Sequence, residues 1–164
     1  MRFKIASAIA LSVAVSVPQV ASAKMPACSP RSVVSDKAIN MAKYSGSLVY
    51  VDFWASWCGP CRKSFAFMNK LRGRYSSSQL KILAISVDED RADAAAFLRK
   101  TPISVDVAID NKGRCPKAYG VRAMPSSYIV APNGEVIYEH VGFRSKDVAE
   151  LDAKIAAAVR KYGK

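Results

Sequence analysis

Two cysteines separated by two residues, Cys58 and Cys61, are the side chains in this sequence best suited to chemistry. A pair at this spacing can switch between dithiol and disulfide, so it can support thiol–disulfide exchange. The pair follows an apolar run at 48–53 that is typical of a buried strand, and a helical pattern begins directly after it. A helix N-terminus carries partial positive charge, which stabilises a thiolate at Cys58. Pro60 suits the first helical position, and Cys61 lies close enough to attack a mixed disulfide formed at Cys58.

Half of a zinc site is the alternative for this pair. A structural zinc site needs four ligands, and the remaining candidates, Cys28, Cys115 and His140, are scattered singly along the chain. We therefore predict no metal site. His140, on the last predicted strand, is expected to be a partly exposed strand residue.

The first 23 residues have the features of a secretory signal peptide. Arg2 and Lys4 form a basic start, an apolar stretch covers 5–17, and small residues end the segment as the cleavage rule requires. The apolar stretch is shorter than the ~20 residues that span a bilayer as a helix, although an uncleaved anchor remains the alternative. Cleavage leaves residues 24–164, enough for one domain, in the periplasm or an otherwise extracytoplasmic compartment.

The chain is basic, with a formal net charge of +12 that falls to +10 when the two basic residues of the signal are removed. Such a charge favours acidic partners or a membrane surface, or it reflects only a well-solvated surface. The basic residues form no dense run and no nucleic-acid motif is present, so we expect no nucleic-acid partner. We expect a monomer.

The other two cysteines have two possible states. Disulfides persist in an oxidising compartment, and a bond between Cys28 and Cys115 would tie the N-terminal segment to the domain. Two free thiols are the alternative. We favour the structural disulfide as a hypothesis.

Hydrophobic periodicity predicts alternating strands and helices. The expected helices cover 33–43, 59–75, 90–100 and 145–162. The expected strands cover 48–54, 80–87, 103–109, 126–130 and 136–141, with a turn at 111–113 and an Asn133-Gly134 hairpin turn between the last two strands. This order argues for an α/β fold with a mixed sheet and helices on both faces.

The sequence resembles the thioredoxin-fold thiol:disulfide oxidoreductases over nearly all of residues 24–164. Five features carry the resemblance: the Trp-Cys-Gly-Pro-Cys segment 57–61, Asp52, the segment 120–125, Asn133-Gly134 and Val141-Gly142. The insertion at 87–109 resembles the secreted TlpA/ResA/DsbE branch. The resemblance implies a thioredoxin-like three-layer sandwich, whose mixed central sheet has helices on both faces and an inserted helix–strand element.

The resemblance also implies a role for each residue around the pair. Cys58 would be the exposed attacking thiolate and Cys61 the buried resolving thiol. A cis peptide bond before Pro125 would present the Met124 backbone to an extended substrate, although an ordinary strand-starting proline is the alternative. The substrate-binding residues implied are Trp57, Gly59, Pro60, Met124 and Pro125.

Asp52 is the most informative polar residue after the cysteines. A carboxyl group inside a buried strand favours its protonated form, and in the resembling family this position relays a proton to or from the buried cysteine. A core aspartate bonded to backbone or water is the alternative. The chain departs from family patterns nearby, because Ala84 replaces a lysine of thioredoxin, and Ser64 and Ala66 replace a glutamate and a proline of the secreted branch.

These features predict an extracytoplasmic reductase of protein disulfides that needs no cofactor. The turn Gly59-Pro60 lacks the histidine that makes a disulfide strongly oxidising, which favours the reductive direction. A disulfide-containing protein, with apocytochrome c or a protein awaiting metal as candidates, would be the substrate, and a membrane thiol–electron donor would recharge the pair. A disulfide oxidase or isomerase with the same residues is the alternative, and a copper-binding chaperone on the same fold is a weaker one.

Overall fold

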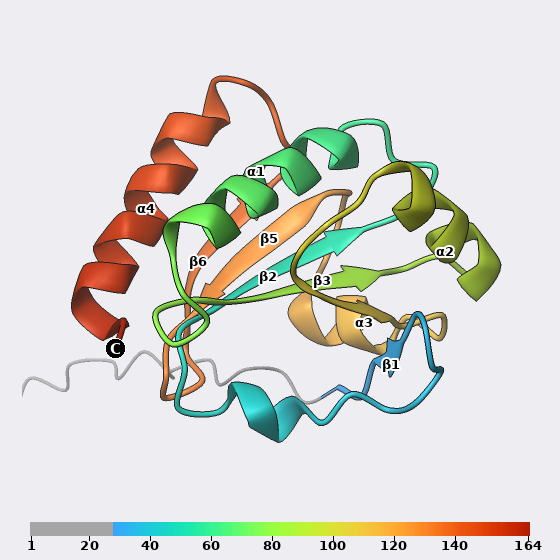
Figure 1. The fold of residues 1–164 in the computed structure, drawn as a ribbon, viewed down its shortest axis with the longest axis horizontal. Coiled ribbons are helices and arrows are strands. Elements are labelled where there is room, and N and C mark those ends of the chain that lie inside the picture. Colours follow the sequence, from blue (N-terminus) through green and yellow to red (C-terminus); the bar gives the residue numbers. More distant parts are fainter. Residues whose placement is uncertain (1–27) are drawn as a thin grey trace, which may run out of the picture.

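A six-stranded mixed sheet forms the centre of the chain in a computed structural model, which describes residues 28–164 (Figure 1). The strand order is β1-β4-β3-β2-β5-β6. Strands β2, β3 and β4 are parallel, whereas β1, β5 and β6 pair antiparallel to their neighbours. The strands are β1 (Arg31–Ser32), β2 (Val49–Trp54), β3 (Lys81–Ser86), β4 (Asp106–Ile109), β5 (Ser126–Val130) and β6 (Val136–Val141). The helices are η1 (Met41–Tyr44), α1 (Cys61–Arg74), α2 (Arg91–Lys100), α3 (Arg114–Tyr119) and α4 (Asp147–Tyr162).

Helices cover both faces of this sheet, as predicted for the α/β fold class. Successive side chains of a strand point to opposite faces, so β2 supplies two cores. Tyr50 and Trp54 pack with α1, α2 and α4, whereas Val51 and Phe53 pack with η1 and α3 (Figure 1). Asp52 lies between Tyr50 and Trp54 in the alternation and therefore faces α1, the helix that begins at Cys61.

The helix predicted at 33–43 is wrong. The structure has a turn after β1, in which the Ser32 hydroxyl accepts hydrogen bonds from the backbone N–H groups of Val34 and Ser35. Asp36 follows with a positive φ of 55°. Only the short helix η1 forms, and it is capped by Asn40. Serine, aspartate and asparagine side chains offer the backbone these local hydrogen bonds, which compete with a continuous helix.

One predicted strand begins later than expected, and one helix was not predicted. The strand predicted at 103–109 begins only at Asp106, because the preceding backbone is bound to α1: Ser104 N–H donates to Asn69 Oδ1 and Asn69 Nδ2 donates to the Pro102 carbonyl. Helix α3 follows the predicted turn at 111–113 and was not predicted. It is short and contains Pro116, which a first helical turn tolerates.

The predicted signal peptide, residues 1–23, lies outside the described residues. Within residues 28–164, no helix combines the length and the apolar character that crossing a membrane requires.

Candidate redox-active site

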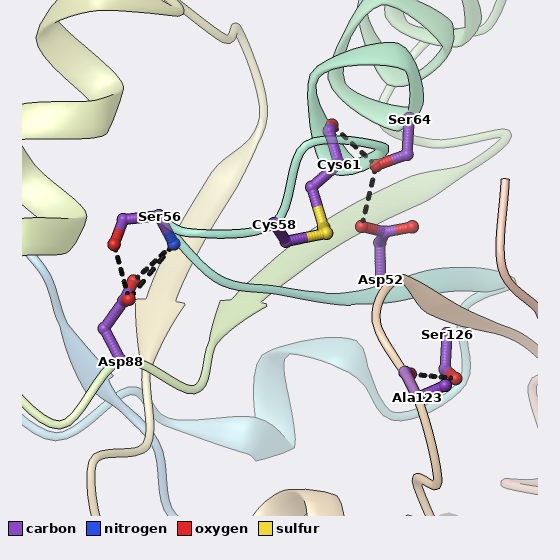
Figure 2. The surroundings of a disulfide bond; sticks show 8 residues. All are labelled: Asp52, Ser56, Cys58, Cys61, Ser64, Asp88, Ala123 and Ser126. Carbon is purple, nitrogen blue, oxygen red and sulfur yellow. Dashed lines mark hydrogen bonds between the residues drawn. A yellow bond between two sulfur atoms is a disulfide. The ribbon is translucent and has the colours of Figure 1, made fainter.

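Cys58 and Cys61 form a disulfide where β2 passes into α1, with Cα atoms 5.4 Å apart (Figure 2). Pro60 precedes the helix with helical backbone angles, and Cys61 is the first helical residue. The helix therefore begins one residue later than predicted, because Pro60 was expected to be its first residue. Cys58 keeps 4% of its surface exposed, whereas Cys61 is fully buried. Cys58, expected to be exposed, is therefore nearly buried in the oxidised enzyme, and it differs from Cys61 by a small accessible surface.

The residues around Cys58 form an exposed rim. The Trp57 side chain is 71% exposed, and Gly59 and Pro60 are also exposed. A large aromatic group at the surface next to a reactive sulfur offers apolar contact area to another protein. The sequence prediction placed these three residues in a substrate contact, and their exposure is compatible with that role.

Met124 and Pro125 lie at the same edge of the sheet as the cysteines. The Met124–Pro125 peptide bond is cis. In the antiparallel register Ser126 pairs with Phe53, so the residues before Ser126 continue past the end of β2 where the cysteines follow. The turn is held by two hydrogen bonds, from Ser126 Oγ to the Ala123 carbonyl and from Gly142 N–H to the Pro125 carbonyl. Met124 is half-buried, so part of its surface stays accessible.

Asp52 is fully buried, and its carboxylate points toward Ser64 beside the disulfide (Figure 2). Ser64 Oγ lies 3.3 Å from Asp52 Oδ1 and 3.0 Å from the Cys61 carbonyl oxygen, so its single hydroxyl hydrogen has two acceptors. Asp52 Oδ2 has no hydrogen-bond partner among the described residues. Its neighbours across the sheet are Ala84 and Ser127, neither of which carries charge.

This environment changes the acidity of the Asp52 carboxyl group. Burial raises its pKa to about 8, because the ionised form loses its hydration, and the Ser64 hydroxyl opposes the rise. Ala84 occupies the position paired with Asp52 on β3, so no cation stabilises the carboxylate from that strand. A carboxyl group of this pKa, joined to the first turn of α1 through the Ser64 hydroxyl, can accept or release a proton near neutral pH.

Asp88 fixes the loop that carries Cys58, a function that sequence reasoning missed. Its carboxylate accepts hydrogen bonds from Ser56 N–H at 3.0 Å and from the Ser56 and Ser86 hydroxyls at 2.7 Å each. Ser56 stands two residues before Cys58, so the end of β3 holds the backbone of the redox turn (Figure 2). An acidic residue directly after a buried strand was the available signal.

Cys28 and Cys115 form a second disulfide, with Cα atoms 5.1 Å apart and a sequence separation of 87. Cys115 is fully buried in α3, and its N–H donates to the carboxylate of Asp110. The bond therefore joins the beginning of the described chain to the sheet face that α3 covers.

Replacing Cys28 and Cys115 together by alanine is expected to lower the free energy of unfolding by about 4 kcal/mol, because the released loop is long. Urea unfolding of the oxidised protein, with Cys58–Cys61 intact in both forms, measures the difference. An unchanged midpoint and slope would show that this bond contributes nothing to stability.

His140 lies on β6, next to the first residue of α4. Its side chain is 13% exposed, and Nε2 lies 3.5 Å from Asp147 Oδ2. Among residues 28–164, no group of three or more histidine, cysteine, aspartate or glutamate side chains is arranged to hold a metal ion.

Comparison with known proteins agrees with this geometry. The Redoxin family model matches residues 20–155. The thiol-disulfide oxidoreductase ResA of Bacillus thuringiensis subsp. konkukian is 34% identical over 124 residues, which cover 74% of this chain and 72% of that protein. ResA of Geobacillus thermodenitrificans is 30% identical over 110 residues, covering 65% and 63% of the two chains.

Solved structures give the same result. A Chlorobium tepidum protein assigned as thiol:disulfide interchange protein DsbE superposes with a TM-score of 0.78 at 40% identity, covering 83% of this chain and 95% of that one. A thioredoxin family protein of Chlorobium tepidum TLS, at 22% identity and a TM-score of 0.72, shares the fold and covers 86% and 99% of the two chains. The fold and the cysteine pair define a thioredoxin-fold redox enzyme. The chain belongs to the Redoxin family, in its branch of ResA- and DsbE-type thiol–disulfide oxidoreductases.

Proposed function

We propose that this enzyme reduces disulfides of other proteins outside the cytoplasm. The unequal exposure of the two cysteines carries this proposal: Cys58 keeps 4% of its surface accessible beside the exposed Trp57, whereas Cys61 is fully buried next to Asp52 and Ser64. A surface thiolate can reach the disulfide of a protein substrate, and a buried neighbour can complete the exchange without competing for substrate.

The reaction proceeds in two exchanges. The Cys58 thiolate attacks one substrate sulfur, a Cys58–substrate disulfide forms, and the substrate disulfide breaks to give a thiolate that takes up a proton. Cys61 then loses its proton to the Asp52 carboxylate, and its sulfur attacks Cys58. The Cys58–Cys61 disulfide forms, the Cys58–substrate disulfide breaks, and the second substrate sulfur leaves as a thiolate that takes up a proton. The enzyme thus loses two electrons and the substrate gains them.

The surrounding groups support these steps. The N-terminus of α1 can stabilise the Cys58 thiolate, because Cys58 stands three residues before the first helical residue and a helix N-terminus carries partial positive charge. Trp57, Gly59, Pro60 and the backbone at Met124 and Pro125 would contact an extended substrate segment. This pairing would resemble the addition of a short strand.

The direction of the reaction is part of the proposal. The residues between the cysteines are Gly59 and Pro60, and neither can stabilise a thiolate by charge as a histidine would. A less stabilised thiolate makes the dithiol form a better electron donor. ResA- and DsbE-type relatives and the signal-like residues 1–23 support export, with 24–164 as the mature domain. A membrane thiol–electron donor would restore the dithiol, and the substrate would be apocytochrome c or another protein that needs free thiols before cofactor or metal loading.

The reduction potential of the Cys58–Cys61 pair tests the direction. We expect a value near or below about −220 mV, in the range of reductive dithiols. Residues 24–164 are equilibrated in glutathione buffers and alkylated, and mass spectrometry of the peptides reads this pair separately from Cys28–Cys115. A value near about −120 mV would instead assign the enzyme to disulfide formation or isomerisation.

A further inference from the structure

An apolar cavity of about 300 Å³ opens on the surface between α1 and the segment that joins β6 to α4. Phe67 and Phe143 form its floor, with ring centroids 5.7 Å apart, and Ala66 and Val148 complete the apolar walls. The exposed fractions of Phe67 and Phe143 are 5% and 6%, so packing in the core fixes the positions of both side chains. The cavity is at the small end of ligand sites, which suits one large side chain of a partner protein rather than an extended cofactor.

The edge of this cavity is positively charged. Lys63 and Lys70 line it, both exposed, and neither forms an ion pair with any residue in 28–164. The carboxylate of Asp147, on the adjoining helix, is already bound to the N–H and the guanidinium of Arg144. Two unpaired ammonium groups around an apolar floor favour an apolar group whose neighbours carry negative charge.

The cavity is lined by two of the segments that also position the redox site. Phe67 lies six residues after Cys61 on the same helix, or about 9 Å along its axis. On the other side, Phe143 follows Gly142, whose N–H donates to the Pro125 carbonyl at 2.7 Å. Figure 1 shows the β6–α4 connection passing beside α1. An extended segment that crosses Cys58 and the turn at Pro125 therefore reaches the cavity within about three residues, at roughly 3.3 Å each.

We propose that this cavity selects substrate proteins, by accepting a large apolar side chain that is flanked by acidic residues and lies about three residues from the attacked disulfide. The apolar side chain contacts Phe67 and Phe143, and the acidic neighbours pair with Lys63 and Lys70. The inference rests on the proposed exchange at Cys58 and adds a substrate class to it.

Four synthetic peptides with one internal disulfide test the proposal. Three residues after the disulfide they carry leucine between two glutamates, leucine between two lysines, leucine between two serines, or serine between two glutamates. The reduced enzyme, as residues 24–164, is mixed with each peptide, and the rate constant of oxidation is followed by tryptophan fluorescence. We expect the leucine–glutamate peptide to react fastest, by about tenfold over the leucine–lysine peptide at low salt.

Matched variants separate this cavity from the overall charge of the protein. Lys63→Glu/Lys70→Glu should remove the preference for glutamate, whereas Lys37→Glu/Lys112→Glu, an equal change at exposed lysines elsewhere, should keep it. Ala66→Trp fills the cavity from its exposed wall and should remove the preference for leucine over serine.

A small neutral disulfide, bis(2-hydroxyethyl) disulfide, reports the exchange reaction itself. All variants should reduce it at the parent rate. Equal rates with all four peptides, or equal losses in the two charge-reversed variants, would overturn the cavity proposal and leave the proposed function intact. Failure of the parent enzyme to react with any of these disulfides would overturn the proposed function, and this inference with it.

Discussion

Replacing Cys61 by serine is expected to trap the enzyme as a covalent complex with its substrate. In this variant Cys58 can still attack the substrate. The sulfur that bonds to Cys58 in the oxidised enzyme belongs to Cys61, so without it the substrate is not released. An oriented intramolecular nucleophile acts at a high effective concentration, so turnover with a protein disulfide should fall by at least about 10³-fold. Non-reducing electrophoresis and mass spectrometry would detect the complex.

Cys58, the more accessible of the two cysteines, provides the matched control. Cys58→Ser should lose turnover to the same extent and form no covalent complex, since the remaining Cys61 is fully buried. Adding dithiothreitol should release the Cys61→Ser complex. If Cys58→Ser formed the complex and Cys61→Ser did not, the roles of the two cysteines would have to be exchanged. In cells that make the protein, the trapped partner of Cys61→Ser would identify the substrate.

The parts of this fold that the sequence predicts well are those with a strong local pattern. The strands at 126–130 and 136–141 have the predicted bounds, because the Asn133-Gly134 turn fixes where the hairpin reverses, and the second strand alternates between less and more exposed residues. The predicted helix at 33–43 failed because local hydrogen bonds from backbone N–H groups to the Ser32 and Asn40 side chains outweigh a weak apolar periodicity. The Ser32 contacts lie at the end of β1, a strand of two residues, which is too short to show a periodic pattern in the sequence.

The site shows the same division between local and long-range information. The spacing of Cys58 and Cys61 is local, so the sequence alone predicts a redox pair. The contact between Ser64 and Asp52 joins α1 to β2, and Ser64 had been noted only as a departure from the family pattern. The anchoring of Ser56 by Asp88 also joins two elements. Neither contact follows from periodicity, because each depends on how a helix or loop packs on the sheet.

Replacing Asp52 by asparagine is expected to stabilise the oxidised enzyme at pH 7. Burial raises the pKa of Asp52 from 3.8 to about 8, so in the folded protein the neutral carboxyl is the favoured form. The stability that this group contributes is complete below pH 3.8 and is lost as the pH rises towards 8, because only the unfolded chain ionises freely across that range. Asparagine removes this loss, which at pH 7 amounts to up to about 4 kcal/mol.

A second buried carboxylate distinguishes this effect from a general response to removing charge. Asp88 accepts hydrogen bonds from Ser56 and Ser86, whereas Asp52 Oδ2 has no partner among the described residues. Asp88→Asn should therefore destabilise the protein, because an amide cannot accept the same set of bonds. Urea unfolding of both oxidised variants between pH 4 and 9 makes the comparison. A parallel pH dependence in the parent and Asp52→Asn would contradict the raised pKa.

The same Asp52 variant tests whether the raised pKa serves catalysis. If Asp52 accepts the Cys61 proton, Asp52→Asn should slow release of the substrate from the mixed disulfide while leaving the initial attack by Cys58 unchanged. The pH–rate profile of the release step should also lose its inflection near the pKa of Asp52, which a purely structural role would leave in place. Stopped-flow measurement of both steps separates these outcomes. A more stable variant with an unchanged release profile would mean that the buried carboxyl is only a cost to folding, and that the Cys61 proton leaves by another route.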